Sequence, residues 1–475
     1  MVGLNLTWAQ TDAISWDAHK VHPTRILAKL AEPAPTDTPA LAALSTLGSR
    51  VVHRYNLVPG LVLLEDTQGR APASIARPDE EWQRQRLWNR IQALKASGQF
   101  EYVEPDYYVR PYLTPRDAAL LDGRLWGLRN LGQNGGLPGV DIAAEAAWDL
   151  TTGSTNVVVA VIDTGIRYTH RDLETQMWRN PGEIPDNGID DDDNGYVDDV
   201  FGIDAVLETG DPMDNDDHGT HVAGTIGAAA NDGNPHVGLA WQVRLMACKF
   251  IGDDGFGSTS DAIQCIDYAV EHGARISNNS WGGAGFSQAL FDAIRRARDR
   301  GMLFVAAAGN ESNDNDRNPS YPASYQLDNI IAVAAIDRTD SLAVFSNYGQ
   351  ASVHLGAPGV EIFSSISGFD ANYDFLDGTS MAAPHVSGVA ALVAAYFPDA
   401  DLDEIRDRIL ASTVPTPALA RTTSTGGRVN AYNALTVTGE GFLQVSVDPP
   451  SGATLLNGSM QPVTVRVRDR FGVRN

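Results

Sequence analysis

The stretch VVVAVID, residues 157–163, decides the fold of the larger part of this chain. It is apolar at every position until it ends in an aspartate, and it lacks the alternation of a strand with one face in water. Four more apolar runs of this kind follow, at residues 243–250, 274–281, 302–310 and 330–337. Segments of helical character separate them, at residues 218–230, 258–273 and 286–301. Apolar strands that alternate with helices predict an α/β fold, a doubly wound, mainly parallel sheet with helices on both faces.

Polar residues stand at the ends of two of these apolar runs. Asp163 ends the first run and Asn310 ends the run at 302–310. In a doubly wound sheet, binding sites form at the carboxyl ends of the strands. Each residue also has a purely structural explanation, because aspartate commonly caps helices and asparagine after glycine is a common turn residue. Neither residue by itself indicates catalysis.

The stretch DGTSMAAPHVSG, residues 377–388, offers a second pair of reactive side chains. Ser380 follows a glycine at a predicted helix start, where unpaired N–H groups and the helix dipole stabilise negative charge. Pro384 is compatible with a helix there, because an early helical N–H has no intrahelical acceptor. Ser380 is therefore either a helix cap or a nucleophile. His385 lies five residues further along the same helix and points to another side, so we interpret it as structural.

A nucleophilic serine needs a base, and the base needs an orienting carboxylate. His218 is the better base, because it opens the small-residue segment HGTHVAGTIGA beside Gly219, where a substrate backbone can approach closely. His221 is placed with small core residues and is interpreted as structural. The chain order is then Asp163, His218, Ser380, which is one of the three known orders of the Asp–His–Ser triad.

Five blocks of sequence carry a resemblance to a known family. AVIDTGI, DHGTHVAGTIGA, NNSWGG, AAAGNES and DGTSMAAPHVSG resemble, in this order, the motifs of the subtilisin-type serine peptidases of family S8, the subtilases. The resemblance covers about residues 125–436. The sedolisins, a related superfamily, have a glutamate where this chain has His218.

The resemblance implies a serine endopeptidase that acts on polypeptide substrates. Ser380 attacks the peptide carbonyl, His218 takes its proton and later protonates the leaving amine, and Asp163 orients the imidazole. Asn310 and the N–H of Ser380 form the oxyanion hole. Two extended segments hold the substrate backbone between them, and the residues expected to bind substrate are Ser280, Trp281, Gly282, Gly283, Gly255, Gly257, Gly309 and Ser320.

Acidic residues exceed basic ones, with 60 Asp and Glu against 35 Lys and Arg and a net charge of −25. This charge argues against a nucleic-acid partner. Residues 183–217 hold fourteen acidic residues and no Lys or Arg. Within them, residues 190–199 have the oxygen spacing of a calcium loop with glycine at the sixth position, although Phe201 stands where an EF-hand has glutamate. The expected ligands are Asp190, Asp192, Asn194, Tyr196 and Asp199.

Clustered carboxylates repel one another without a cation, so we favour structural Ca²⁺ over a solvated acidic loop. The resemblance implies a second calcium ligand at Asp172. The loop that completes this second site in the family, here residues 231–238, is altered, which leaves the number of calcium sites open.

The N-terminal region reads as a small α+β domain of strands and one amphipathic helix at residues 79–97, whose apolar face carries Trp82, Leu87, Ile91 and Leu94. In the resemblance this domain is an inhibitory propeptide that occupies its own enzyme's cleft, so the chain is a self-processing zymogen. Residues after 436 alternate apolar and polar positions, like the first strands of an incomplete β-sandwich. The expected segments are 1–23 undefined, 24–110 propeptide, 111–124 linker with the maturation site, 125–436 catalytic and 437–475 β-rich.

The location and the partners follow from the same resemblance. Neither a signal peptide nor a run of eighteen apolar residues is visible, so no membrane partner is expected. Such zymogens are generally exported, and we therefore expect a secreted monomer. Cys248 and Cys265 are either two buried thiols or one disulfide. A catalytically idle binding protein and a calcium-dependent adhesive module are the rival interpretations; the complete catalytic set argues against the first, and the short C-terminal segment against the second.

Overall fold

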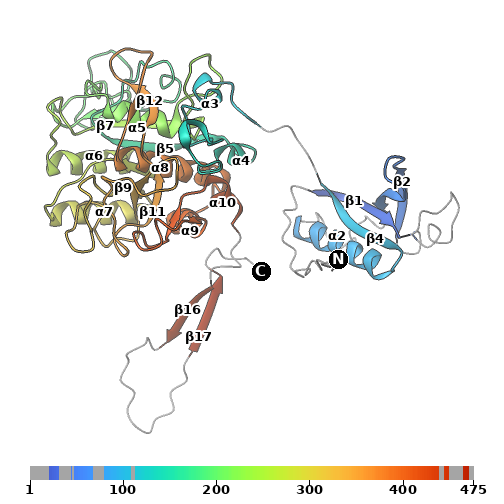
Figure 1. Ribbon diagram of the computed structural model, residues 1–475. Coiled ribbons are helices and arrows are strands. Elements are labelled where there is room, and N and C mark those ends of the chain that lie inside the picture. Colours follow the sequence, from blue (N-terminus) through green and yellow to red (C-terminus); the bar gives the residue numbers. More distant parts are fainter. Residues whose placement is uncertain are drawn as a thin grey trace, which may run out of the picture. The chain divides into compact units, whose positions relative to one another are not determined.

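The computed structural model describes residues 21–31, 44, 48–67, 80–107 and 113–437, together with strands at 443–448 and 464–469. The chain divides into a smaller unit, Met1–Pro111, and a larger unit, Tyr112–Asn475. Each unit has a sheet of its own (Figure 1). Each unit also has its own buried cluster of apolar side chains. None of the helices in the described ranges combines the length and the apolarity needed to cross a membrane.

The smaller unit is an antiparallel sheet packed on one helix. Its strand order is β2-β3-β1-β4, and its elements are β1 (Val21–Leu30), β2 (Ser49–Arg54), β3 (Leu61–Asp66), α2 (Glu80–Ala96) and β4 (Phe100–Tyr107). Leu87, Ile91 and Leu94 of α2 are buried in its core, as the helical spacing predicts. The side chain of Trp82, expected on the same face, lies outside the described residues.

A nine-stranded sheet forms the centre of the larger unit. Its order is β14-β15-β11-β10-β9-β8-β5-β7-β6, and all neighbours are parallel except the β14–β15 pair. The five predicted apolar runs are all strands in this sheet. The strands are β5 (Gly153–Asp163), β6 (Gly202–Asp204), β7 (Gln242–Lys249), β8 (Ile276–Asn279), β9 (Leu303–Ala307), β10 (Ile330–Ile336), β11 (Leu355–Pro358), β14 (Val414–Pro415) and β15 (Gly427–Arg428).

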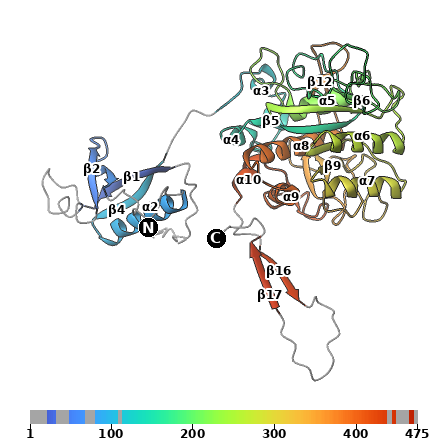
Figure 2. The ribbon, with the colours of Figure 1, turned by 180° about the vertical axis from the view of Figure 1, so that it is seen from behind.

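Helices cover both faces of this sheet, which is why its strands are apolar at consecutive positions. Val159 and Val161 of β5 face a core shared with α5 (His218–Gly227) and α8 (Thr379–Tyr396). Ala160 and Ile162 face the opposite core, shared with α6 (Thr259–Glu271) and α7 (Gln288–Asp299). Figures 1 and 2 show α6 and α7 together on one side of the larger unit. The predicted doubly wound α/β fold is confirmed.

Shorter elements complete the larger unit on the side of α8. They are α3 (Ala118–Leu121), η2 (Gln133–Gly135), α4 (Ala144–Trp148), α9 (Leu402–Ala411), α10 (Ala431–Thr436) and the hairpin of β12 (Ile362–Ile366) and β13 (Asn372–Leu376). Far apart in sequence, α4 and α10 lie side by side (Figures 1 and 2).

The segment before residue 125 differs from the expected linker. Ala119 and Leu120 of α3 are buried in the same core as β5, and the Ala119 N–H donates to the carbonyl of Pro235. The described part of the C-terminal segment is one antiparallel hairpin of β16 (Leu443–Asp448) and β17 (Thr464–Asp469).

Candidate active site

Asp163 and His218 meet at the carboxyl end of the central strand β5. His218 begins α5, and its Nδ1 lies 2.6 Å from Oδ1 of Asp163. The Asp163 side chain is fully buried, whereas 26% of the His218 side chain is exposed. A carboxylate only accepts hydrogen bonds, so Nδ1 is the donor, and when the ring is neutral Nε2 is an acceptor. This is the tautomer that a general base requires.

The acidic surroundings set the proton affinity of His218. Burial by itself lowers the pKa of this imidazole, but the Asp163 carboxylate, with Asp216 and Asp214 behind it, outweighs burial and raises the pKa above its usual value. Burial also raises the pKa of Asp214, a shift that hydrogen bonds from Thr220 oppose. The net result is a ring whose protonated form is stabilised by fixed negative charge.

Thr164 joins the two catalytic candidates, although no sequence signal singles it out. Its N–H donates to Asp163 Oδ1 at 2.8 Å, and its Oγ1 accepts from the N–H of Gly219 at 2.8 Å. The same hydroxyl donates to the buried Asp214 at 2.9 Å. A Cβ on Gly219 would lie 2.1 Å from the carbonyl oxygen of Gly165. The start of α5 therefore packs directly on the turn after β5, and glycine alone fits there.

Thr379 holds the side chain of Asn310, which follows β9, by hydrogen bonds. The Asn310 Oδ1 accepts from both the N–H and the hydroxyl of Thr379, each at 2.9 Å. The Thr379 Oγ1 also accepts from the N–H of Gly309 at 3.0 Å. Because these bonds assign Oδ1, the amide nitrogen Nδ2 of Asn310 is directed away from Thr379.

Ser380 lies one residue further, in the first turn of α8. Its N–H and the Asn310 Nδ2 are respectively 3.4 and 3.5 Å from the point that a side chain on Gly378 would occupy. Two donors thus border a space that is open because residue 378 is glycine. The Ser380 Oγ donates to the carbonyl of Ser280 at 3.1 Å, and the Ser280 hydroxyl donates to the carbonyl of Ser380 at 2.8 Å. The Ser380 hydroxyl is thus hydrogen-bonded to the segment that follows β8. The hydrogen bond between a nucleophile and its base often forms only in the complex with substrate.

The other histidines of the two motifs face the interior. His221 contacts the carbonyl of Ile362 at 2.8 Å, and burial lowers its pKa to about 3. His385 contacts the carbonyl of Met381 at 2.9 Å, and burial lowers its pKa to about 4. Both rings are therefore neutral in ordinary conditions, in keeping with their interpretation as structural.

Comparison with known proteins identifies the family of this arrangement. Residues 154–436 match the sequence model of the Subtilase family (Peptidase_S8). The chain belongs to the subtilase family. The membership makes it a serine endopeptidase of the subtilisin type, a class that acts on polypeptides.

Named relatives are proteases. This subtilase is 37% identical over 346 residues to the thermophilic serine proteinase of Bacillus sp. (strain AK1). The aligned residues make up 73% of this chain and 75% of the Bacillus protein. This subtilase is 35% identical over 295 residues to subtilisin-like protease 1 of Plasmodium vivax, covering 58% of this chain but only 46% of that protein. A solved protease structure from Pseudoalteromonas arctica is 30% identical, has a TM-score of 0.54 and covers 68% of this chain and 98% of that chain.

One expected substrate edge follows β8 in this subtilase. Gly282 and Gly283 are exposed, whereas the Trp281 ring packs against Phe250 with centroids 4.9 Å apart. The N–H and the carbonyl of Gly283 are both paired with Tyr321, at 2.8 and 2.7 Å. The backbone of Gly283 is consequently occupied within the protein.

The pocket residues expected near this edge lie beside it. A Cβ on Gly282 would lie 3.3 Å from the hydroxyl of Ser320. The N–H of Gly309 donates to the Thr379 hydroxyl, and its carbonyl accepts from the N–H of Asn347, so both backbone groups of Gly309 are paired.

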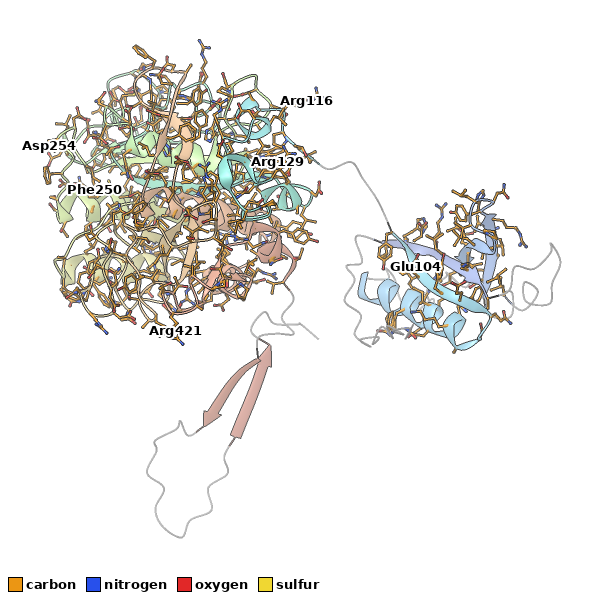
Figure 3. All side chains as sticks on the ribbon, viewed as in Figure 1. Glu104, Arg116, Arg129, Phe250, Asp254 and Arg421 are labelled. Carbon is orange, nitrogen blue, oxygen red and sulfur yellow. The ribbon has the colours of Figure 1, made fainter. Side chains whose placement is uncertain are left out.

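The other expected edge is the turn after β7. Ile251 and Gly257 form an antiparallel bridge, and the N–H of Gly252 donates to the carbonyl of Phe256 at 2.9 Å. Residues 253–260, which include Gly255 and Gly257, are exposed. Figure 3 labels Phe250 and Asp254 in this part of the chain. The Phe250 contact with Trp281 brings the two edges next to each other.

The acidic loop gathers a set of carboxylates that differs from the expected one. Oxygens of Glu183, Asp192 and Asp199 all lie within 4.8 Å of one another. Glu183 precedes the loop by seven residues and was not among the expected ligands; its spacing carries no motif. Asp192 and Asp199 were expected. The close approach of three carboxylates is the kind of oxygen donor set that Ca²⁺ binds.

The remaining expected loop ligands shape the loop. The Asp190 carboxylate accepts from the N–H groups of Asn194 and Gly195, at 3.1 and 2.8 Å. The Asn194 side chain accepts from the N–H of Tyr196 at 2.9 Å and donates to Asp199 at 3.0 Å. These bonds hold the two acidic ends of the loop together.

Asp172 lies elsewhere, as a fully buried carboxylate. Neither of its oxygens makes a well-formed hydrogen bond among the described residues. Burial raises its pKa to about 8, which the Tyr373 hydroxyl opposes and the Asp232 carboxylate reinforces. A buried carboxyl without a partner is stable only when it is protonated or bound to a cation, so the site is compatible with a metal ion.

Cys248 and Cys265 are both free and buried. Of the two possibilities that the sequence leaves open, the structure has the pair of buried thiols.

Proposed function

We propose that this subtilase hydrolyses peptide bonds through an acyl-enzyme, with Ser380 as nucleophile, His218 as general base and acid, and Asp163 as its orienting carboxylate. The contact of 2.6 Å between His218 Nδ1 and the buried Asp163 is the observation that carries this proposal. It leaves Nε2 as the acceptor for the proton of the attacking hydroxyl, which then passes to the leaving amine. The charge of Asp163 stabilises the imidazolium that forms between these two steps.

The negative oxygen of the tetrahedral intermediate is assigned to the space beside Gly378. The Asn310 amide and the Ser380 N–H are the donors that border it. Donors held in place before the reaction need no reorganisation when the charge develops, and this makes their stabilisation large. Thr379 supplies that rigidity on the Asn310 side.

An extended peptide substrate is assigned to the groove between residues 280–283 and the turn that holds Gly255 and Gly257. The backbone of the substrate would pair with Ser280, Trp281 and Gly282, because the N–H and carbonyl of Gly283 are already paired with Tyr321. Gly283, Gly309 and Ser320 then line the pocket for the substrate side chain.

The smaller unit is assigned the role of an inhibitory propeptide, so that the chain is made as a self-processing zymogen. The buried side chains of Asp117 and Leu120 support a cut that lies before Asp117, in the first part of the 111–124 segment. A cut after that point would remove buried residues from the larger unit. We further propose that the mature enzyme is a secreted monomer that has no nucleic-acid or membrane partner.

Calcium is assigned to two places. At the first place, Glu183, Asp192 and Asp199 would bind the ion through their carboxylates. The Tyr196 carbonyl would add one more oxygen ligand. Asp190 and Asn194 would hold the loop in shape through their hydrogen bonds. At the second, Asp172 would contribute a buried carboxylate whose oxygens make no well-formed hydrogen bond in the described part of the chain. In both places the ion would neutralise clustered charge and stabilise the fold.

Activity-based labelling tests the catalytic proposal. The full chain would be incubated with casein and with a fluorophosphonate that reacts with activated serine. We expect casein cleavage, labelling and shortening of the chain, all of which Ser380→Ala abolishes. Ser387→Ala is the matched control, because Ser387 lies on the same helix and donates to Asn278 in the interior. Cleavage and labelling that survive Ser380→Ala would refute the assignment, and a fully inert wild-type chain would favour a binding protein.

A further inference from the structure

Lys249 is an isolated cation beneath the candidate active site. It is the one lysine of the sequence after residue 95, and arginine supplies all other cationic side chains of the larger unit. The residue ends β7 and is paired in register with Asp163 of the neighbouring strand β5. It is only 4% exposed. A charged group is rarely buried to this degree unless it is bound on several sides.

One hydrogen bond of Lys249 supports the catalytic turn. The ammonium Nζ donates to the carbonyl oxygen of Thr164 at 2.7 Å. The N–H and the hydroxyl of Thr164 are the groups that bond Asp163 and the N–H of Gly219. Lys249 therefore fixes the third polar group of the residue that joins the carboxylate to the start of the histidine helix.

The second hydrogen bond reaches the substrate side. Nζ lies 3.1 Å from Oδ1 of Asp253, which belongs to the exposed turn after β7. The other oxygen of Asp253 accepts from the Asn215 side chain at 3.4 Å, in the loop that leads to His218. The Asp253 side chain is itself 61% exposed, and its ion pair with the buried Lys249 holds it against the protein.

We propose that Lys249 is a positioning residue that couples the Asp163–His218 pair to the substrate-binding turn at residues 252–257. The proposal rests on the proposed function of both elements. One ammonium holds the Thr164 carbonyl on the catalytic side and the Asp253 carboxylate on the substrate side, so the two parts of the site keep one geometry.

The charge of Lys249 also acts on the catalytic histidine. Asp163 on β5 and Asp204 on β6 are in register with Lys249, and Asp253 on the turn is paired with it. Asp214 and Asp216, before α5, act on His218 together with Asp163. Of the described residues named here, Lys249 carries the positive charge and the other five are acidic. Removing it leaves a more negative environment, which stabilises the protonated form of His218.

The test compares Lys249→Met, which keeps the length and loses the charge, with Lys249→Arg. Arg244→Met is the matched control, because Arg244 lies on the same strand and donates to the carbonyl of Thr175, away from the site. Steady-state kinetics would be measured across pH, with the active fraction counted by fluorophosphonate labelling. For Lys249→Met we expect kcat/KM per active site to fall by about tenfold or more, and the acid limb of its pH profile to move to higher pH. Lys249→Arg is expected to restore the position of the acid limb, and Arg244→Met to match wild type.

Asp253→Asn removes the ion pair between Lys249 and the substrate-binding turn and keeps the bond of Lys249 to Thr164. It tests the proposal even if Lys249→Met does not fold. We expect KM to rise severalfold with kcat within about twofold of wild type. Unchanged KM in this variant, or an unchanged pH profile per active site in Lys249→Met, would overturn the proposal. Its failure is distinct from failure of the proposed function, because the latter leaves the wild-type chain unlabelled or leaves Ser380→Ala active.

Discussion

The side-chain carbonyl of Asn310 accepts two hydrogen bonds from Thr379, one from its N–H and one from its hydroxyl, both at 2.9 Å. The residue next to the proposed nucleophile thus orients the proposed oxyanion donor, which lies in the loop after β9. The hydroxyl also accepts from Gly309, so a single side chain ties the β9 loop to the start of α8. Loss of this hydroxyl would free the Asn310 amide to rotate.

Substitution of Thr379 tests this relationship. Thr379→Val removes the hydroxyl at nearly constant volume and keeps the backbone N–H bond to Asn310. We expect kcat to fall by about tenfold while KM changes little, since the misplaced donor acts mainly in the transition state; complete loss of such an amide in subtilisin, a member of the same family, costs ~10²–10³. Thr379→Ser should retain most of the activity. Equal kinetics for the valine and serine variants would contradict the orienting role.

With His218 as the proposed general base, the pH dependence of kcat/KM should report the ionisation of this histidine in the free enzyme. The base must be neutral, and its pKa is raised, so we expect the acid limb to lie above pH 6.5. Asp216 is one cause of the raised pKa and is exposed. Asp216→Asn should therefore move the limb to lower pH by roughly 0.2–0.7 unit, as expected for exposed charge pairs.

High salt should shrink this shift, because exposed charges are screened. Asp299→Asn, at the end of α7, removes an equal charge away from the site and should leave the limb in place. A shift in the opposite direction in Asp216→Asn would refute the electrostatic account.

Chelation tests the calcium proposal at the acidic loop. We expect a chelator to lower the melting temperature, because an ion bound only to the folded state stabilises it, by ~2.7 kcal/mol at 100 times its Kd. Glu183→Gln should reduce the calcium-dependent part of this shift more than Asp190→Asn does, since Asp190 is occupied with the backbone of its own loop. A melting temperature that is the same with calcium and with chelator would remove the proposal.

Gly219 tests the packing of α5 on the turn after β5. A Cβ there would lie 2.1 Å from a backbone oxygen, whereas one on the exposed Gly285 would meet nothing within 4 Å. We expect Gly219→Ala to lower the free energy of unfolding by about 1–3 kcal/mol, the usual cost of overpacking, and to reduce activity through the displaced His218. Gly285→Ala should melt like wild type. Thermal unfolding of the two variants measures the difference in their stability. Equal stability would show that the turn after β5 moves to make room for the added Cβ.

The elements of this fold could be predicted because their signals are local. Five largely apolar runs without alternation, separated by helical segments, predict the sheet. Val161 is buried on one face of the sheet and Ile162 on the other, which explains the lack of alternation. The short strands β14 and β15 carried no such signal, since two residues have no period. The segment before residue 125 has no strong pattern of its own and reads as a linker, because the burial of Ala119 and Leu120 depends on a partner surface from distant strands.

The sequence alone determined the residue types that chemistry requires, their chain order and the strand ends or helix starts on which they stand. It did so because the motifs around Asp163, His218 and Ser380 are contiguous. Tertiary structure alone decided which side chains join them: Thr164, Thr379 and Lys249 act through contacts that span long stretches of chain, and Glu183 joins its acidic loop without a motif. Hydrogen bonds between separate segments depend on packing geometry, which leaves no periodic trace in the order of residues.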